Sequence, residues 1–127
     1  MSFDWSDFLK LAESLARAER ASSLEEAALR SAVSRAYYAA YCASRNHARD
    51  LGEIILTRGS KDHGIVQDHY QHSRVRDYQK IGAWLERLRD NRNCADYDDV
   101  LQENLKSLTQ SSLAQARNVF RLLNGLE

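Results

Sequence analysis

The stretch SLEEAALRSAVSRAYYAAYCASRNHARDL, residues 23–51, decides the fold. Ser23 followed by Glu26 has the spacing of a capping box, and Gly52, directly after the stretch, is a typical helix stop. The spacing predicts one long helix that begins at Ser23 and ends before Gly52. Alanine recurs along its whole length, which leaves little side-chain bulk and allows neighbouring helices to approach closely. We therefore expect this helix to lie at the centre of the protein.

Amphipathic patterns flank the long helix on both sides. Apolar residues recur at 3–4 spacing in further segments, which predicts helices over residues 4–20, 61–73, 74–93 and 98–125. Asp4 is the expected cap of the first of these, and Asp98 or Asp99 the expected cap of the last. Residues 52–60 hold two glycines around a short apolar run and are expected to form a connector. The sequence predicts an all-α protein, an up-and-down bundle of four or five helices.

Length, composition and charge narrow the class of protein. At 127 residues the chain has the size of one domain, so residues 1–127 are expected to form a single domain. Because the formal net charge is zero, any RNA contact would need a local basic cluster. The two cysteines lack the spacing of a metal or redox motif, the N-terminus carries no signal-peptide pattern, and no apolar run reaches the roughly 18 residues that span a bilayer. These features predict a cytoplasmic protein without a membrane partner.

An apolar stripe on the fourth predicted helix ends in an arginine. The members of the stripe lie three or four positions apart and are Val75, Tyr78, Ile81, Leu85 and Leu88. The next position on the same face is Arg92, and Arg89 shares part of that face. A buried guanidinium needs an anion beside it. Two interpretations are open: Asp96, Asp98 or Asp99 supplies the anion within a helix-end salt-bridge network, or the two arginines clamp a phosphate.

The long helix also carries polar side chains where a purely structural central helix would carry leucine. One side of the helix carries Arg30, Ser34, Tyr37 and Tyr41. The neighbouring face carries Arg35 and Tyr38. Tyrosines at helical spacing more often pack in a core or an interface than take part in chemistry. A face that mixes tyrosine with arginine nevertheless matches the composition of a binding groove or a dimer contact.

Metal and cofactor motifs are missing from the sequence. His63, His69 and His72 lie close together in sequence, but no Glu-x-x-His pair, on which carboxylate metal sites in helical bundles depend, occurs. There is also no glycine-rich phosphate loop and no Gly-x-Ser-x-Gly. We therefore predict neither a metal site nor a cofactor.

Three segments together resemble the HEPN family: SRAYYAAYCASRNHA over 34–48, KDHGIV over 61–66 and LRDNRNCADYDD over 88–99. Members of that family are small helical bundles that usually pair as dimers, and many are metal-independent RNases, often toxins found beside an antitoxin nucleotidyltransferase. The resemblance implies a HEPN-like bundle that forms a homodimer. It also implies RNA as the ligand and a nucleotidyltransferase antitoxin as a partner, and it gives no reason to expect DNA.

The catalytic motif of the family is an arginine, a polar residue and, after four to six intervening positions, a histidine. Arg92 and Asn93 match the first two positions, but Tyr97, Asp98 or Asp99 stands where the histidine is expected. In that chemistry the 2′-hydroxyl attacks the adjacent phosphate, arginine stabilises the charge of the phosphorane, and histidine moves the proton. The resemblance implies Arg92, Asn93 and Tyr97 as catalytic candidates, although tyrosine, with an ordinary pKa near 10, is a poor base at neutral pH.

The binding candidates are Arg89, Asp96, Arg35, Tyr37, Tyr41 and His63. His63 or His47 could replace the missing histidine from another helix, but nothing in the sequence places either of them near Arg92. Three hypotheses stay open: a HEPN-like dimer that binds RNA, a nucleotide or a partner protein through an Arg/Tyr groove; a metal-independent RNase toxin with a degenerate motif; and a helical scaffold. In the toxin pairings an antitoxin can modify a tyrosine near the motif, which makes Tyr97 the candidate acceptor.

Overall fold

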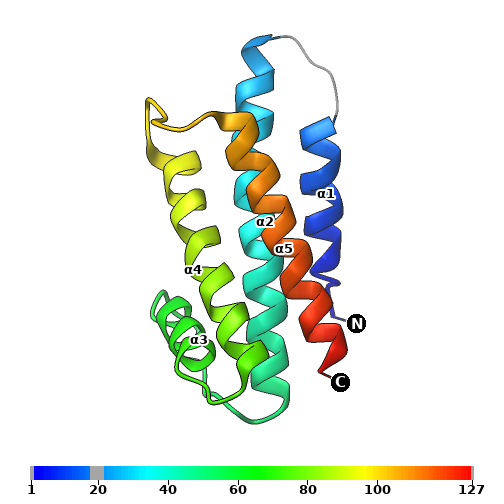
Figure 1. The fold of residues 1–127 in the computed structure, drawn as a ribbon, viewed down its shortest axis with the longest axis vertical. Helices are drawn as coiled ribbons and strands as arrows, with labels where there is room; N and C mark the ends of the chain where they lie inside the picture. Colours follow the sequence, from blue (N-terminus) through cyan, green and yellow to red (C-terminus); the bar gives the residue numbers. More distant parts are fainter. Residues whose placement is uncertain (1, 18–21, 127) are drawn as a thin grey trace.

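The computed structural model describes residues 2–17 and 22–126, and its bundle is all-helical over these ranges. The five helices are α1 (Ser6–Arg17), α2 (Ser22–Asp50), α3 (Asp62–Gln71), α4 (Arg76–Tyr97) and α5 (Leu105–Gly125). The four longer helices run alternately up and down, and the short α3 lies beside the start of α4 (Figure 1). This arrangement confirms the predicted all-α bundle. None of the described helices combines the length and the apolar character needed to cross a bilayer.

Helix α2 is central, as its alanine content predicted. It packs against each of the other helices, and its buried alanines are Ala28, Ala32, Ala36, Ala39, Ala40 and Ala48. The helix ends at the predicted glycine: Gly52 has φ of 71°, its N–H donates to the carbonyl of Arg49, and the N–H of Glu53 donates to the carbonyl of Ala48. The helix begins at Ser22. The predicted capping box depends on the side chain of Ser23, which lies outside the described residues.

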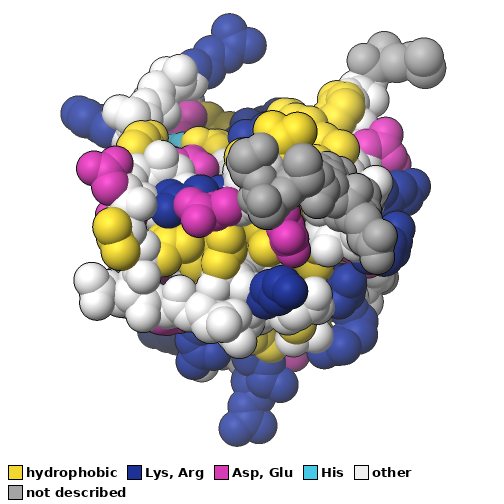
Figure 2. Space-filling view, turned by 90° about the horizontal axis from the view of Figure 1, so that it is seen from above, with side chains coloured by type: hydrophobic (Ala, Val, Ile, Leu, Met, Phe, Trp, Pro, Cys, Tyr) yellow, Lys and Arg dark blue, Asp and Glu magenta, His cyan; other side chains and the backbone are white. Residues whose placement is uncertain are grey.

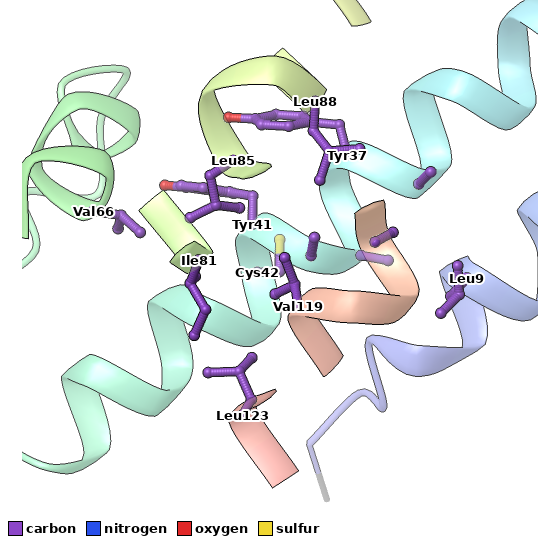
Figure 3. Packing of buried hydrophobic residues seen from close by; sticks show 14 of the residues in the cluster. Leu9, Tyr37, Tyr41, Cys42, Val66, Ile81, Leu85, Leu88, Val119 and Leu123 are labelled. Atoms are coloured by element: carbon purple, nitrogen blue, oxygen red, sulfur yellow. The ribbon is translucent and has the colours of Figure 1, made fainter. Parts of the chain in front are cut away.

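The predicted stripe of α4 forms much of the core. Its buried members are Tyr78, Ile81, Leu85 and Leu88, and the same face continues through Arg92 and Ala95. Figure 3 shows Leu85 and Leu88 packed against Tyr37 and Tyr41 of α2, whose hydroxyls both point toward the side of the bundle that carries α3. Val75 was wrongly included in the stripe, because it precedes the helix and is 50% exposed. The helix also continues past its predicted end at Asn93 to Tyr97.

The predicted cap of the last helix is wrong. Helix α5 begins at Leu105, and its cap is Asn104, whose side-chain oxygen accepts a hydrogen bond from the N–H of Ser107 at 3.0 Å. Residues 98–104 form a loop instead, so neither Asp98 nor Asp99 is followed by a helical turn. At the N-terminus, Asp4 Oδ1 accepts a hydrogen bond from the N–H of Ser6 at 3.0 Å, as a cap should. The predicted end of that first helix, near residue 20, lies outside the described residues.

Two contacts hold α3 and the preceding segment in place. A Cβ on Gly82 of α4 would lie 2.6 Å from the backbone nitrogen of Gln71, so the absence of a side chain lets α3 pack directly on α4. The carboxylate of Asp62 accepts hydrogen bonds from the N–H and the hydroxyl of Thr57 and from the N–H of Arg58, which ties the connector to the first turn of α3. These contacts determine where the next residue, His63, lies.

Candidate functional site

Arg92 is the most unusual buried residue of the bundle. It is 9% exposed, and its guanidinium carbon lies 5.2 Å from the ring centroid of Tyr37 and 5.5 Å from that of Tyr38. Among the described residues, none accepts a hydrogen bond from this guanidinium, and its Nε atom is buried without a partner. The nearest carboxylate oxygen, Asp96 Oδ2, is 3.9 Å from Nη1, beyond hydrogen-bonding distance. A buried permanent charge without a bonded counterion is costly, and it remains free to bind an anion.

A different arginine binds the main chain at the C-terminal end of α4. Arg30 of α2 donates from Nη1 to the carbonyls of Ala95 and Asp98, at 3.0 and 2.6 Å, and from Nη2 to that of Asp99 at 3.4 Å. A helix-end network therefore exists: Arg30 binds main-chain carbonyls, and Arg92 forms a long ion pair with Asp96, one of the three expected aspartates, at 3.9 Å. The role of Arg30 could not be predicted from the sequence, because the carbonyls lie 65 to 69 positions away from Arg30.

Asp96 is the one aspartate of the motif segment that faces the buried arginine. Its Oδ2 atom accepts a hydrogen bond from the hydroxyl of Ser34 at 3.3 Å, as well as lying 3.9 Å from Arg92. The carboxylate side chain is 28% exposed, so its charge is partly screened by water. Asp96 therefore offsets part of the Arg92 charge without binding the guanidinium directly.

The position of His63 relative to Arg92 could not be predicted from the sequence. The Nδ1 atom of His63 is hydrogen-bonded to the hydroxyl of Tyr37, and its ring stacks on Tyr41 with the centroids 4.2 Å apart and 10° between the planes. Arg92 lies over the ring of the same Tyr37, so one tyrosine of α2 contacts both the arginine of α4 and the histidine of α3. The structure thus brings a histidine close to the motif arginine from another helix, where the sequence offers none after Arg92.

The electrostatics of this cluster favour uncharged His63 and Tyr37. Burial and the positive charges of Arg89 and Arg92 lower the pKa of His63, and burial raises the pKa of Tyr37 far above its usual range. Burial also raises the pKa of Tyr41 to about 12. At neutral pH the tyrosines therefore keep their protons and His63 is a neutral imidazole. Such an imidazole can accept a proton, and the imidazolium that then forms can donate it, which is what general acid–base chemistry requires.

The other candidate site residues lie in different places in the structure. Arg89 is half-buried on α4, one turn before Arg92, and close enough to lower the pKa of His63. Asn93 is exposed, and Tyr97 is 72% exposed; no hydrogen bond or ring contact joins either of them to the cluster in the described part of the chain. Arg35 and Arg92 both lie over the ring of Tyr38, at 5.1 and 5.5 Å from its centroid. Arg35 lines an adjoining groove of about 1070 Å³ between α1, α2 and the connector, which Tyr41 and His63 also line.

The geometry unites Arg89, Arg92, Tyr37, Tyr41 and His63 and leaves Asn93 and Tyr97 at the surface. Two permanent cations and a neutral histidine around buried tyrosines can bind a phosphate and move a proton beside it. In the described ranges, no three His, Cys, Asp or Glu side chains lie close enough to share a metal ion. Comparisons with protein-family models, with curated proteins and with solved structures find no match to this chain.

Proposed function

We propose that the protein binds RNA, and that Arg92 and Arg89 hold a backbone phosphate where α2, α3 and α4 meet. The observation that carries the proposal is the buried Arg92 guanidinium, which has no hydrogen-bonded anion among the described residues. A planar guanidinium matches the oxygens of a phosphate, and Arg89 adds a second charge one turn away. The resemblance of the sequence to the HEPN family favours RNA among the phosphate-bearing ligands.

The test is RNA binding by wild type and by Arg92→Gln, measured by fluorescence anisotropy of a labelled RNA in EDTA. Losing charge-assisted hydrogen bonds worth roughly 1.5 to 3 kcal/mol should weaken binding by about tenfold to a hundredfold and reduce its salt dependence. Arg121→Gln, an exposed change of equal charge on α5, is the control and should bind RNA almost as wild type does. Equal affinities of wild type and Arg92→Gln would contradict the proposal and leave the scaffold interpretation.

RNA cleavage is a second candidate function, favoured by the position of His63 beside Tyr37 and Arg92. The 2′-hydroxyl of the substrate would attack the adjacent phosphorus, the 5′-oxygen of the next nucleotide would leave, and the products would be a 2′,3′-cyclic phosphate and a 5′-hydroxyl. His63 would move the proton and Arg92 would stabilise the phosphorane charge. Cleavage in EDTA by wild type, with its loss in both His63→Gln and Arg92→Gln, would support this function. Cleavage that persists in His63→Gln would remove His63 from the mechanism.

The proposal includes a homodimer, which the family resemblance supports. Leu24, Tyr97 and Val100 are 59, 72 and 76% exposed at the end of the bundle where α2 begins and α4 ends. Figure 2 looks onto this end and shows hydrophobic side chains between acidic and basic ones. Sedimentation of wild type and Val100→Asp at tens of micromolar tests the pairing: wild type should sediment as a dimer and the variant as a monomer. A wild-type monomer would contradict this part of the proposal.

The same resemblance supports a nucleotidyltransferase antitoxin as the partner protein. Tyr97 is accessible enough to be its acceptor, because it is 72% exposed at the end of α4. Co-expression with a neighbouring nucleotidyltransferase, followed by mass spectrometry of wild type and Tyr97→Phe, tests this assignment. A mass increase that also appears in Tyr97→Phe would exclude Tyr97 as the acceptor.

A further inference from the structure

We propose that the groove between α1 and α2 holds unpaired bases of single-stranded RNA, stacked on its aromatic rings, while its arginines contact the adjoining phosphates. This inference rests on the proposed RNA binding and names the form of RNA that the protein takes. The groove, called the α1–α2 groove below, has a volume of about 1070 Å³. Its aromatic walls are Trp5, Phe8, Tyr38, Tyr41 and His63, and its arginines are Arg35, Arg45, Arg49 and Arg58.

Arginines and aromatic rings alternate along one wall of the groove. The guanidinium carbon of Arg35 lies 4.9 Å from the ring centroid of Phe8 and 5.1 Å from that of Tyr38. Arg45 repeats the arrangement, at 5.5 Å from Trp5 and 5.9 Å from Tyr41. Arg35 thus lies between a ring of α1 and a ring of α2, and Arg45 lies between Trp5, which precedes α1, and a ring of α2. Flat rings and flat cations in alternation are the kind of surface on which nucleobases stack.

The groove carries a surplus of positive charge, although the whole chain has a formal net charge of zero. Among the described residues, Arg35, Arg45 and Arg58 form no ion pair, while Arg49 pairs with Asp50 at 3.0 Å. The one carboxylate of the lining, Asp62, already accepts hydrogen bonds from the segment before it, namely from Thr57 and Arg58. The surplus of positive charge therefore favours a ligand that carries negative charge.

The aromatic rings of the groove and its positive charge together indicate which ligand it binds. A purely acidic peptide would satisfy the arginines but carries no flat group to lie against the rings and guanidinium groups, whereas an apolar molecule would bring no anion to the arginines. A single nucleic-acid strand supplies a flat base and a phosphate at every step. In a duplex the bases are stacked within the helix, so their faces are closed to the rings of the protein.

The α1–α2 groove lies beside the proposed phosphate site and shares residues with it. His63 and Tyr41 line the groove and also belong to the cluster around Tyr37. Tyr38 lines the groove too, and Arg92 lies 5.5 Å from its ring centroid. The ring of Tyr38 therefore belongs both to the groove wall and to the surroundings of Arg92, so a strand bound at Arg92 would have its neighbouring bases next to the groove.

Trp5 provides a direct readout, because it lines the groove whereas Trp84, on α4, does not. In a Trp84→Phe background, an unstructured RNA 12-mer should quench the Trp5 emission, since a stacked base quenches an indole. The same strand annealed to its complement should bind roughly tenfold more weakly or worse and should leave the emission nearly unchanged.

Two substitutions separate ligand binding from the packing of α1 on α2. Arg45→Gln should weaken single-strand binding by roughly tenfold, but it also removes contacts to the rings of Trp5 and Tyr41. Arg58→Gln, in the connector, makes no ring contact or ion pair among the described residues; it should lower single-strand affinity severalfold while the melting temperature stays the same. Arg121→Gln on α5 is the control of equal charge and should behave as the background protein.

The outcomes distinguish this inference from the function on which it rests. Equal affinity for single-stranded and paired RNA, unchanged Trp5 emission, and no effect of Arg58→Gln would overturn the groove proposal, while sensitivity to Arg92→Gln would keep the phosphate site. If no RNA of either form binds, the proposed function fails and the groove proposal fails with it. Single-strand preference with Trp5 quenching and an Arg58→Gln defect would establish the groove as a base-stacking site.

Discussion

The hydroxyl of Tyr37 on α2 is hydrogen-bonded to Nδ1 of His63 on α3, between residues that lie 26 positions apart in the sequence. The Tyr37 side chain is 2% exposed, and its ring also lies under the guanidinium of Arg92 on α4. One buried tyrosine therefore links a histidine and an arginine that come from different helices. The protonation state of this cluster follows from its burial and from the two arginines beside it.

The lowered pKa of His63 predicts a loss of stability on mild acidification. In the unfolded chain His63 takes up a proton near its ordinary pKa of 6.5, whereas burial, Arg89 and Arg92 keep the folded imidazole neutral to lower pH. The unfolded state then binds more protons, so the free energy of unfolding falls as pH decreases from about 6.5 to the folded pKa. Melting curves between pH 7.5 and about 5 should show this fall in wild type and a smaller one in His63→Gln. His72→Gln, at an exposed histidine, should retain the wild-type slope.

Replacing Arg92 by an apolar residue of similar length should not destabilise the protein. The guanidinium is buried and its nearest carboxylate oxygen is 3.9 Å away, so Arg92→Met removes a desolvated charge while its side chain fills the same space. The free energy of unfolding, measured in urea, should stay within about 1 kcal/mol of wild type or rise. A drop of roughly 3 to 5 kcal/mol would instead show that the Arg92–Asp96 pair holds the fold together.

Gly82→Ala should destabilise the bundle by about 1 to 3 kcal/mol, because the added methyl would meet the backbone of Gln71 at 2.6 Å and push α3 away from α4. Urea unfolding measures the cost. Gly64→Ala in α3 is the matched control: its new methyl meets nothing within 4 Å, so it should stabilise the helix by up to about 1 kcal/mol. If Gly82→Ala were as stable as wild type, the close packing of α3 on α4 would be wrong.

Arg30→Gln should loosen the connection between α4 and α5. The substitution removes the donor to the carbonyls of Ala95, Asp98 and Asp99, which should cost about 1 to 3 kcal/mol in the free energy of unfolding. Hydrogen exchange of the amides in residues 96–104 should become faster, while exchange in the α1–α2 contact stays the same. Arg121→Gln serves as the control of equal charge, and similar exchange in both variants would contradict the role of Arg30.

Much of the fold could be predicted because its signals are local. The stripe from Tyr78 to Leu88 depends only on the period of a helix, and the end of α2 depends on the left-handed backbone that Gly52 adopts with φ of 71°. The same period carries the stripe to Arg92, so the burial of this arginine was predicted without a structure. The start of α5 was missed because the sequence does not distinguish an aspartate that caps a helix from one in a loop. The carbonyls of Asp98 and Asp99 are bound by Arg30, which is far away in the sequence.

The sequence by itself determined the helices, the central position of α2 and the burial of Arg92, since periodicity and helix-end residues act over a few positions. Only the tertiary structure decided that His63 meets Tyr37, that Arg30 binds the end of α4, that Tyr97 stays at the surface, and that Arg35 and Arg45 share a groove with rings of α1. These relationships depend on how whole helices pack, and packing joins residues through shape and burial rather than through their spacing along the chain.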